Sequence, residues 1–267
     1  MTVATARPRW LAVAILLVVP AAALTTMSAE IPLAERRSGY DLMSPQTRAM
    51  QDDDTANPGM LWVLDGEALW QRKAGAEGRS CGDCHGEAGA SMKGVAARYP
   101  VFDPPSARPI DLEQRIEQCR TERQKAAPFG RESRELLALT AHVARQSRGL
   151  PIADMAADDK LRPFLEAGRV AFTRRQGQLD LSCTLCHDDN WGKHLAGNPV
   201  PQGHPTGFPL YRLEWQAMGS LQRRLRNCMI GMRAEPYAYG APEYVELQLY
   251  LMWRARGLPI ETPAVRP

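Results

Sequence analysis

Two short cysteine and histidine motifs carry the chemistry that this sequence could perform. Each has the pattern Cys-x-x-Cys-His, in which two thiols add across the vinyl groups of a haem and the adjacent imidazole binds the iron. The motif residues are Cys81, Cys84 and His85 in the first copy and Cys183, Cys186 and His187 in the second. Together they use four of the six cysteines and two of the five histidines, so the sequence predicts two covalent c-type haems.

The two remaining cysteines, Cys119 and Cys228, follow the motif histidines by 34 and 41 residues. A c-type haem needs a ligand on its other face, which is a methionine in most such proteins. Here each motif is followed by a thiol on the apolar stripe of an amphipathic helix, because leucine or isoleucine precedes it by three and by seven residues. We therefore predict that Cys119 and Cys228 are axial iron ligands.

Other assignments stay open at this point. Cys119 and Cys228 could form a disulfide in an exported protein, or could be buried thiols without chemistry. A methionine could replace either thiol as ligand, and the candidates are Met92, Met218, Met229 and Met232. His142, His194 and His204 are not assigned to the site, because a single histidine is usually structural.

Cys228 is the stronger candidate for a reactive sulfur. Arginines surround it at positions 223, 226 and 233, and Arg224 lies one helical turn before it on the same face. A thiolate beside a metal and cations is nucleophilic, and guanidinium groups attract and orient a small anion. We therefore predict that Cys228 and Arg224 are catalytic. Because Arg115 precedes Cys119 by the same four residues, pairing of both arginines with haem propionates is the alternative.

The elements that would position these residues are repeated along the chain. Gly66 and Gly168 begin matching stretches before the two haem motifs, with the same offset of 102 residues that separates the motifs. The predicted ligand helices match at an offset of 109, and a Gly-Leu-Pro-Ile segment at 149–152 returns at 257–260. Self-similarity of this kind indicates two copies of one folding unit.

Each unit is expected to contain a helix, the haem motif, an irregular loop, the ligand helix and a final helix at 131–146 or 242–254. Strand patterns are scarce, so the predicted fold class is all-α, with two tandem cytochrome c-like domains that each hold one haem. The expected boundaries are 1–29 for a signal peptide, 30–152 for an N-terminal extension and domain 1, and 153–267 for domain 2. A linker is expected at 150–161.

Composition and the N-terminus bound the function. The chain has 267 residues, 44% hydrophobic and 24% charged, which suits two globular domains of roughly 110 residues. The formal charge of +3 includes Arg7 and Arg9, so no nucleic-acid partner is indicated. These arginines precede an uncharged run at 10–24, which predicts export to the periplasm with a cleaved signal peptide. An uncleaved anchor is the alternative.

At this stage the chain resembles a known family. The two Cys-x-x-Cys-His motifs and the Arg-Arg-Leu-Arg-Asn-Cys segment at 223–228 resemble those of the SoxA family, the dihaem subunits of the SoxAX cytochromes of sulfur-oxidising bacteria. The resemblance covers nearly the whole chain after the leader. It includes the segments 38–40, 51–54, 57–62, 203–209 and 233–236.

This resemblance implies an L-cysteine S-thiosulfotransferase, which oxidatively joins thiosulfate to a cysteine of a SoxYZ carrier protein and releases two electrons. It implies that Cys228 ligates the second haem and carries a persulfide, that Arg224 binds the substrate, and that Cys119 ligates the first haem. The implied partners are a SoxX-like monohaem cytochrome c, the SoxYZ-like carrier, thiosulfate and a small cytochrome c that accepts the electrons.

Two other functions are compatible with the residues. A dihaem thiosulfate dehydrogenase that forms tetrathionate uses the same histidine/cysteine ligation, and a non-catalytic dihaem electron carrier would use methionine ligands. A dihaem peroxidase needs an open iron, against which the two matched cysteines argue. Product analysis with and without a carrier protein separates the transferase from the dehydrogenase.

Overall fold

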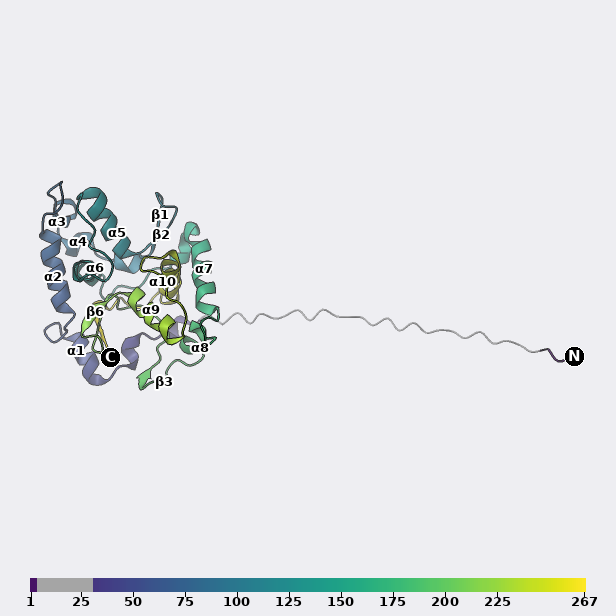
Figure 1. The fold of residues 1–267 in the computed structure, drawn as a ribbon. Coiled ribbons are helices and arrows are strands. Elements are labelled where there is room, and N and C mark those ends of the chain that lie inside the picture. The colour runs from purple at the N-terminus through teal and green to yellow at the C-terminus, as the bar shows by residue number, and fades with distance from the viewer. Residues whose placement is uncertain (4–30) are drawn as a thin grey trace.

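The computed structural model describes residues 1–3 and 31–267, so the predicted signal peptide lies outside the described residues apart from its first three. The described chain is mostly helical (Figure 1). Its α-helices are α1 (Pro45–Asp52), α2 (Met60–Gln71), α3 (Cys81–His85), α4 (Ala88–Ser91), α5 (Leu112–Gln118), α6 (Arg134–Arg145), α7 (Arg162–Thr173), α8 (Cys183–His187), α9 (Leu221–Gly231) and α10 (Pro242–Arg254). Within residues 31–267, no helix combines the length and apolar character that crossing a membrane requires.

Short strands accompany the helices, which the all-α prediction did not include. They are β1 (Val101–Asp103), β2 (Arg108–Ile110), β3 (His194–Leu195), β4 (Asn198–Pro199), β5 (Leu210–Arg212), β6 (Ala217–Gly219) and β7 (Ala264–Arg266). β1 and β2 form an antiparallel hairpin, as do β5 and β6, and β7 adds to β5 in parallel. Strands of two or three residues are too short to show an alternating pattern in the sequence. The β1–β2 and β5–β6 hairpins lead into α5 and α9, and so fix where the two predicted ligand helices begin.

The main helix pairs are α2 with α6 and α7 with α10, which lie on different sides of the molecule (Figure 1). In each pair the two backbones approach closely at a glycine. A Cβ atom on Gly66 would lie 2.1 Å from the carbonyl oxygen of Ala138, and one on Gly168 would lie 2.1 Å from that of Glu246. Backbones this close leave room only for glycine, which gives a physical reason for the matched glycines before the two haem motifs.

The two Gly-Leu-Pro segments hydrogen-bond to each other. The amide of Gly149 donates to the carbonyl of Ile260 at 2.8 Å, and the amide of Gly257 donates to the carbonyl of Ile152 at 2.9 Å. The amides of Ile152 and Ile260 donate in the same way to the leucine carbonyl of the opposite segment, each at 2.9 Å. Each hydrogen bond from the first segment to the second is therefore matched by one from the second to the first, between the equivalent residues.

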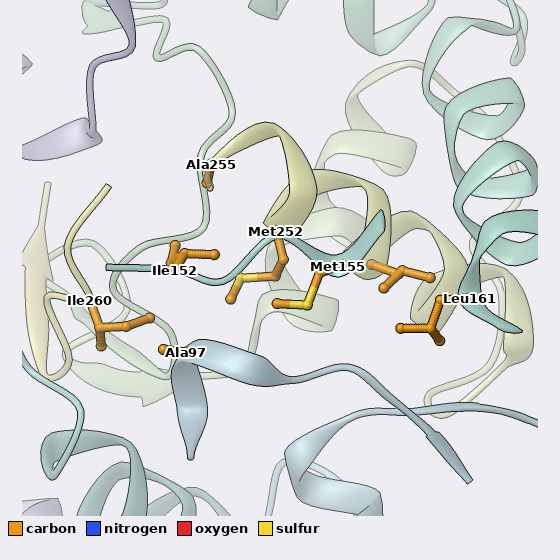
Figure 2. Close-up of a cluster of buried hydrophobic side chains, with 8 residues drawn as sticks. Ala97, Ile152, Met155, Leu161, Met252, Ala255 and Ile260 are labelled. Carbon is orange, nitrogen blue, oxygen red and sulfur yellow. The ribbon is translucent and has the colours of Figure 1, made fainter. Parts of the chain in front are cut away.

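A cluster of buried apolar side chains continues from this pairing, because Ile152 and Ile260 belong to both. Its members are Ala97, Ile152, Met155, Leu161, Leu249, Met252, Ala255 and Ile260. Within it, Met155 lies beside Met252, which belongs to α10 (Figure 2). The segment predicted as a linker, 150–161, is thus packed into the core through the 3-10 turns η5 (Met155–Ala157) and η6 (Asp159–Leu161).

A buried polar network ties the starts of α5 and α9 together. Asp111 caps α5 by accepting a hydrogen bond from the amide of Gln114 at 2.7 Å, and it also accepts one from the side chain of Gln222 in α9 at 2.9 Å. Arg131 donates to Asp111 at 3.1 Å and to Glu113 at 2.8 Å. Burial, and then the charge of Asp111, raise the pKa of Glu113 to about 8. The network holds the two predicted ligand helices in one arrangement.

The start of α9 yields a test of stability. Ser220→Ala is expected to lower the free energy of unfolding by about 1 kcal/mol, because the Ser220 hydroxyl caps α9 by accepting a hydrogen bond from the amide of Arg223 at 3.1 Å. Ser220→Gly should lose only about a few tenths of a kcal/mol, since glycine is a tolerated N-cap. Urea unfolding of the haem-loaded protein measures both, and equal losses in the two variants would contradict the capping role.

Candidate functional site

Each Cys-x-x-Cys-His motif forms one turn of helix, α3 or α8, with a serine at its start. The hydroxyls of Ser80 and Ser182 accept hydrogen bonds from the amides three residues further on, at 2.9 Å and 3.4 Å. The turn places the two cysteines of a motif on one helix face, as double attachment to a flat cofactor requires. All six cysteines lie in the described part of the chain and are free thiols. Burial raises the pKa of Cys81 to about 11 and that of Cys183 to about 12, so both are protonated at neutral pH.

A cavity of about 1130 Å³, including its open mouth, adjoins the second motif. His187 lines it, and the Nδ1 of this histidine donates a hydrogen bond to the carbonyl of Pro201 at 2.6 Å, which leaves Nε2 available to a metal. Cys228 also lines the cavity and lies within hydrogen-bonding reach of His187. Much of the lining is apolar and includes Phe172, Phe208, Leu221, Leu225, Leu247 and Leu251.

The surroundings of Cys228 are positively charged. Burial alone would raise its pKa, but the hydrogen bond from His187 and the charges of Arg224, His187 and Arg212 outweigh burial and lower the pKa below its ordinary value. Arg224 lies one turn before Cys228 on α9 and lines the same cavity. The structure thus brings together His187, Arg224 and Cys228. It adds Arg212 at the end of β5, which no spacing in the sequence links to Cys228.

A cavity of about 1170 Å³, including its open mouth, adjoins the first motif. His85 and Cys119 both line it, together with Arg115 and Met92. The ring of His85 packs on that of Trp70, with centroids 5.8 Å apart, and the indole N–H of Trp70 donates to the backbone carbonyl that follows His85. Cys119 begins a π-helical turn, η4 (Cys119–Arg123), that continues α5. Local π-helical geometry is frequent at functional sites.

Cys119 and Cys228 therefore lie in separate cavities, each with the histidine of its own motif. Both are free thiols, so the alternative of a disulfide between them is wrong. Burial raises the pKa of Cys119, and the nearby charges of Arg115 and Arg123 oppose this only in part. The pKa of Cys228 is lowered where that of Cys119 is raised, so without a cofactor the surroundings of Cys228 are the more favourable of the two to a thiolate.

The alternative methionine ligands are placed differently. Met92 lines the first cavity. Met218, Met229 and Met232 are buried in the protein core, where the sulfur of Met229 accepts a hydrogen bond from the hydroxyl of Tyr244 at 3.3 Å. None of these four methionines lines the second cavity, whose described sulfur-containing residues are Met43, Cys183 and Cys228.

His204, which the sequence left unassigned, lines the second cavity. Its Nδ1 donates to the carbonyl of Arg37 at 2.8 Å, while its buried Nε2 has no hydrogen-bond partner among the described residues. Burial lowers the pKa of His204 to about 4, so the ring is neutral. A single histidine has no spacing signal that could have revealed this position. His142 instead packs on Trp70, and His194 is exposed in β3.

A buried ion pair supports the second motif. Asp188 follows His187, and its carboxylate accepts a hydrogen bond from Arg254 of α10 at 2.5 Å, with only 10% and 8% of the two side chains exposed. The guanidinium of Arg254 also lies over the ring of Phe172, 4.6 Å from its centroid. These contacts hold the end of α8 against α10 and α7, and so restrict the orientation of His187.

Both cavities fit a c-type haem. Each is lined by one cysteine of its attachment turn, Cys81 or Cys183, by the histidine of that turn, by a further thiol from another helix, and by apolar side chains for the flat ring. The other cysteine of the motif, Cys84 or Cys186, lies one helical turn further on. The unpartnered Nε2 of His204 is a polar atom that a bound group in the second cavity could meet.

Comparison with known proteins gives a consistent result. Residues 65–152 match the family model described as SoxA/TsdA, cytochrome c domain. The L-cysteine S-thiosulfotransferase subunit SoxA of Pseudaminobacter salicylatoxidans is 39% identical over 235 residues, which cover 88% of this chain and 82% of that protein. The subunit of the same name from Rhodovulum sulfidophilum is 37% identical over 232 residues, with coverage of 87% and 80%.

The crystal structure of SoxXA from P. pantotrophus has the same fold. It superposes with a TM-score of 0.82 at 32% sequence identity, and the match covers 87% of each chain. The family model and this structure together identify the fold as that of a cytochrome c, with c-type haem as its cofactor.

Proposed function

Since this chain belongs to the SoxA family, we propose that it is the catalytic dihaem subunit of an L-cysteine S-thiosulfotransferase. In the reaction, the thiol of a carrier cysteine and the thiosulfate dianion give a Cys-S-S-sulfonate, one proton and two electrons. The observation that carries this function is the convergence of His187, Arg224 and Cys228 on one cavity. A plain electron carrier needs no thiol flanked by arginines at its iron site.

The proposal assigns one c-type haem to each cavity. The first would be held covalently by Cys81 and Cys84, with His85 and Cys119 binding its iron. The second would be held by Cys183 and Cys186, with His187 and Cys228 binding its iron. When bound, these groups supply the one-electron redox chemistry that removes the two electrons. The bond from His187 Nδ1 to Pro201 fixes the ring and raises its basicity as a ligand.

Cys228 is the proposed active-site sulfur, which holds a further sulfur atom as a persulfide. The charges of Arg224 and Arg212, which lower the pKa of Cys228, support an anionic, nucleophilic sulfur at this position. Arg224 has no ion pair with any of the described residues, so its guanidinium is available to bind and orient the thiosulfate dianion. The apolar lining of the cavity strengthens this attraction by excluding water.

The remaining parts of the proposal concern organisation and partners. Two cytochrome c-like domains, at 30–152 and 153–267, account for the repeated hairpins and helices. The likeness to a SoxXA structure supports a SoxX-like monohaem cytochrome c as partner. Electrons would leave through it toward a small cytochrome c. A SoxYZ-like protein is the proposed carrier.

Covalent haem attachment outside the cytoplasm agrees with a periplasmic protein whose signal peptide, 1–29, is cleaved.

Product analysis of the purified haem-loaded complex tests this function. With thiosulfate, oxidised cytochrome c and a carrier that presents one reduced cysteine, we expect mass spectrometry to show one added thiosulfonate per carrier and two reduced cytochromes per product. A carrier with its cysteine replaced by serine serves as control. Tetrathionate formed without the carrier would instead identify a thiosulfate dehydrogenase, and haem reduction without either product would identify an electron carrier.

A further inference from the structure

Arg212 lies at the proposed reaction site although no motif points to it. It ends strand β5, its side chain is 11% exposed, and it lines the cavity that contains Cys228 and Arg224. Its buried Nε has no hydrogen-bond partner among the described residues. Arg212 and Arg224 line the same cavity, and after burial the charge of Arg224 is the next cause that lowers the pKa of Arg212.

The first half of the chain shows what this position does elsewhere. At the offset of 109 residues, Arg115 corresponds to Arg224, and Asp103 at the end of β1 corresponds to Arg212. Arg115 donates to Asp103 at 3.1 Å, and only 2% of the Asp103 side chain is exposed. The strand thus supplies an acid that neutralises the arginine of the first ligand helix. In the second half, the corresponding strand β5 supplies Arg212. The first half therefore has an oppositely charged pair, Asp103 and Arg115, where the second half has two positive charges, Arg212 and Arg224.

Little within the protein compensates this doubled charge. Arg212 has one ion pair, at 3.2 Å to Glu214, whose carboxylate is largely exposed and therefore a weak partner. No aspartate or glutamate is among the described residues that line the cavity. Arg266, a further arginine of the lining, is itself paired with Glu261. Two guanidinium groups in an apolar cavity favour an anion of matching charge, for which a substrate dianion and the propionates of the proposed haem are the two candidates.

We propose that Arg212 is the second guanidinium of a two-arginine site that binds the substrate beside Cys228 and selects a dianion over a monoanion. This inference rests on the proposed function and adds a specificity-determining residue to it. Arg212 and Arg224 together carry the charge that neutralises thiosulfate, and each offers several N–H donors to its oxygens. A small monoanion leaves one guanidinium uncompensated and binds less tightly.

Equilibrium binding to the oxidised, haem-loaded complex without carrier tests the site. Calorimetry with thiosulfate, sulfate as an inert dianion and nitrate as a monoanion is carried out on Arg212→Gln, Arg212→Lys and Arg212→Asp. We expect Arg212→Gln to weaken thiosulfate and sulfate binding by about 10- to 100-fold and nitrate binding far less. Arg212→Asp, which recreates the pairing of the first half, should abolish binding, and Arg212→Lys should restore part of it.

The matched control is Arg175→Gln, which removes the same charge from an exposed arginine bonded to Asp180 outside the cavity. It should leave all three affinities unchanged. Unchanged thiosulfate affinity in Arg212→Gln, with a shifted potential of the second haem, would show that Arg212 pairs with a haem propionate and would overturn the inference. Failure of the wild-type complex to modify the carrier, with the affinities as expected, would refute the proposed function and leave the anion site standing.

Discussion

Cys228→Ser is expected to lower the rate of thiosulfate conjugation by on the order of 10³-fold or more, with haem still attached at Cys183 and Cys186. A serine oxygen cannot carry the additional sulfur atom, and a neutral hydroxyl is a poor substitute for a thiolate beside the iron. The charges of Arg224 and Arg212 both lower the pKa of Cys228 and so favour an anionic sulfur at this position. Turnover with carrier and oxidised cytochrome c measures the loss, and electron paramagnetic resonance should show that one low-spin, thiolate-type signal disappears.

Cys119→Ser provides the matched comparison, because it removes the equivalent thiol from the other half. It should alter the other haem signal and leave the carrier reaction much less affected. The physical difference is that Arg115 is neutralised by Asp103, whereas Arg224 is not paired within the described residues. If the activity of Cys228→Ser stayed within tenfold of wild type, this would contradict the sulfur-transfer mechanism and favour an electron carrier.

Gly168→Ala is expected to destabilise the protein by about 3 kcal/mol or more, although alanine is intrinsically the better helix former. The new Cβ would lie 2.1 Å from the carbonyl oxygen of Glu246 and 2.8 Å from the Cβ of Tyr250. Backbone atoms cannot turn aside as the end of a side chain can, so α7 and α10 must separate. Urea unfolding of the haem-loaded protein measures the loss, which should be accompanied by a changed spectrum of the second haem.

Gly231→Ala in α9 is the control with the opposite sign. A Cβ at Gly231 would meet no atom within 4 Å, so this change should stabilise the protein by about 0.5 kcal/mol through the lower entropy of the unfolded chain. If both variants shifted the stability by the same amount, the close approach at Gly168 would have no energetic importance.

The attachment turns and the second ligand helix could be predicted from the sequence because their patterns are local. One helical turn relates the cysteines of each motif, and the spacing of Leu221, Leu225 and Cys228 describes one face of α9. The first ligand helix is less regular, since α5 ends at Gln118 and Cys119 already belongs to the π-helical turn. A π-helical turn depends on one extra residue per turn, which the apolar spacing does not encode.

The charged residues that lie beside Arg115 and Arg224 could not be predicted, because short strands supply them. Asp103 and Arg115 lie 12 residues apart and meet only through the β1–β2 hairpin. The same holds for Arg212, and these strands are too short for a sequence pattern. His204 reaches the second cavity from an irregular loop, where no periodicity applies. Residues whose positions depend on loops and short hairpins therefore needed the structure.

The exchanged hydrogen bonds between 148–152 and 256–260 have a symmetry that bears on the origin of this architecture. Gly149 bonds to Ile260 as Gly257 bonds to Ile152, which is the pattern of an isologous interface, where one patch meets its own copy around a two-fold axis. Such a contact would serve two identical chains as well as one fused chain. Its presence within a single polypeptide is what a self-associating ancestor with a single haem would leave behind. The arginine at position 212, where the first half has Asp103, would then be a later specialisation of the second half.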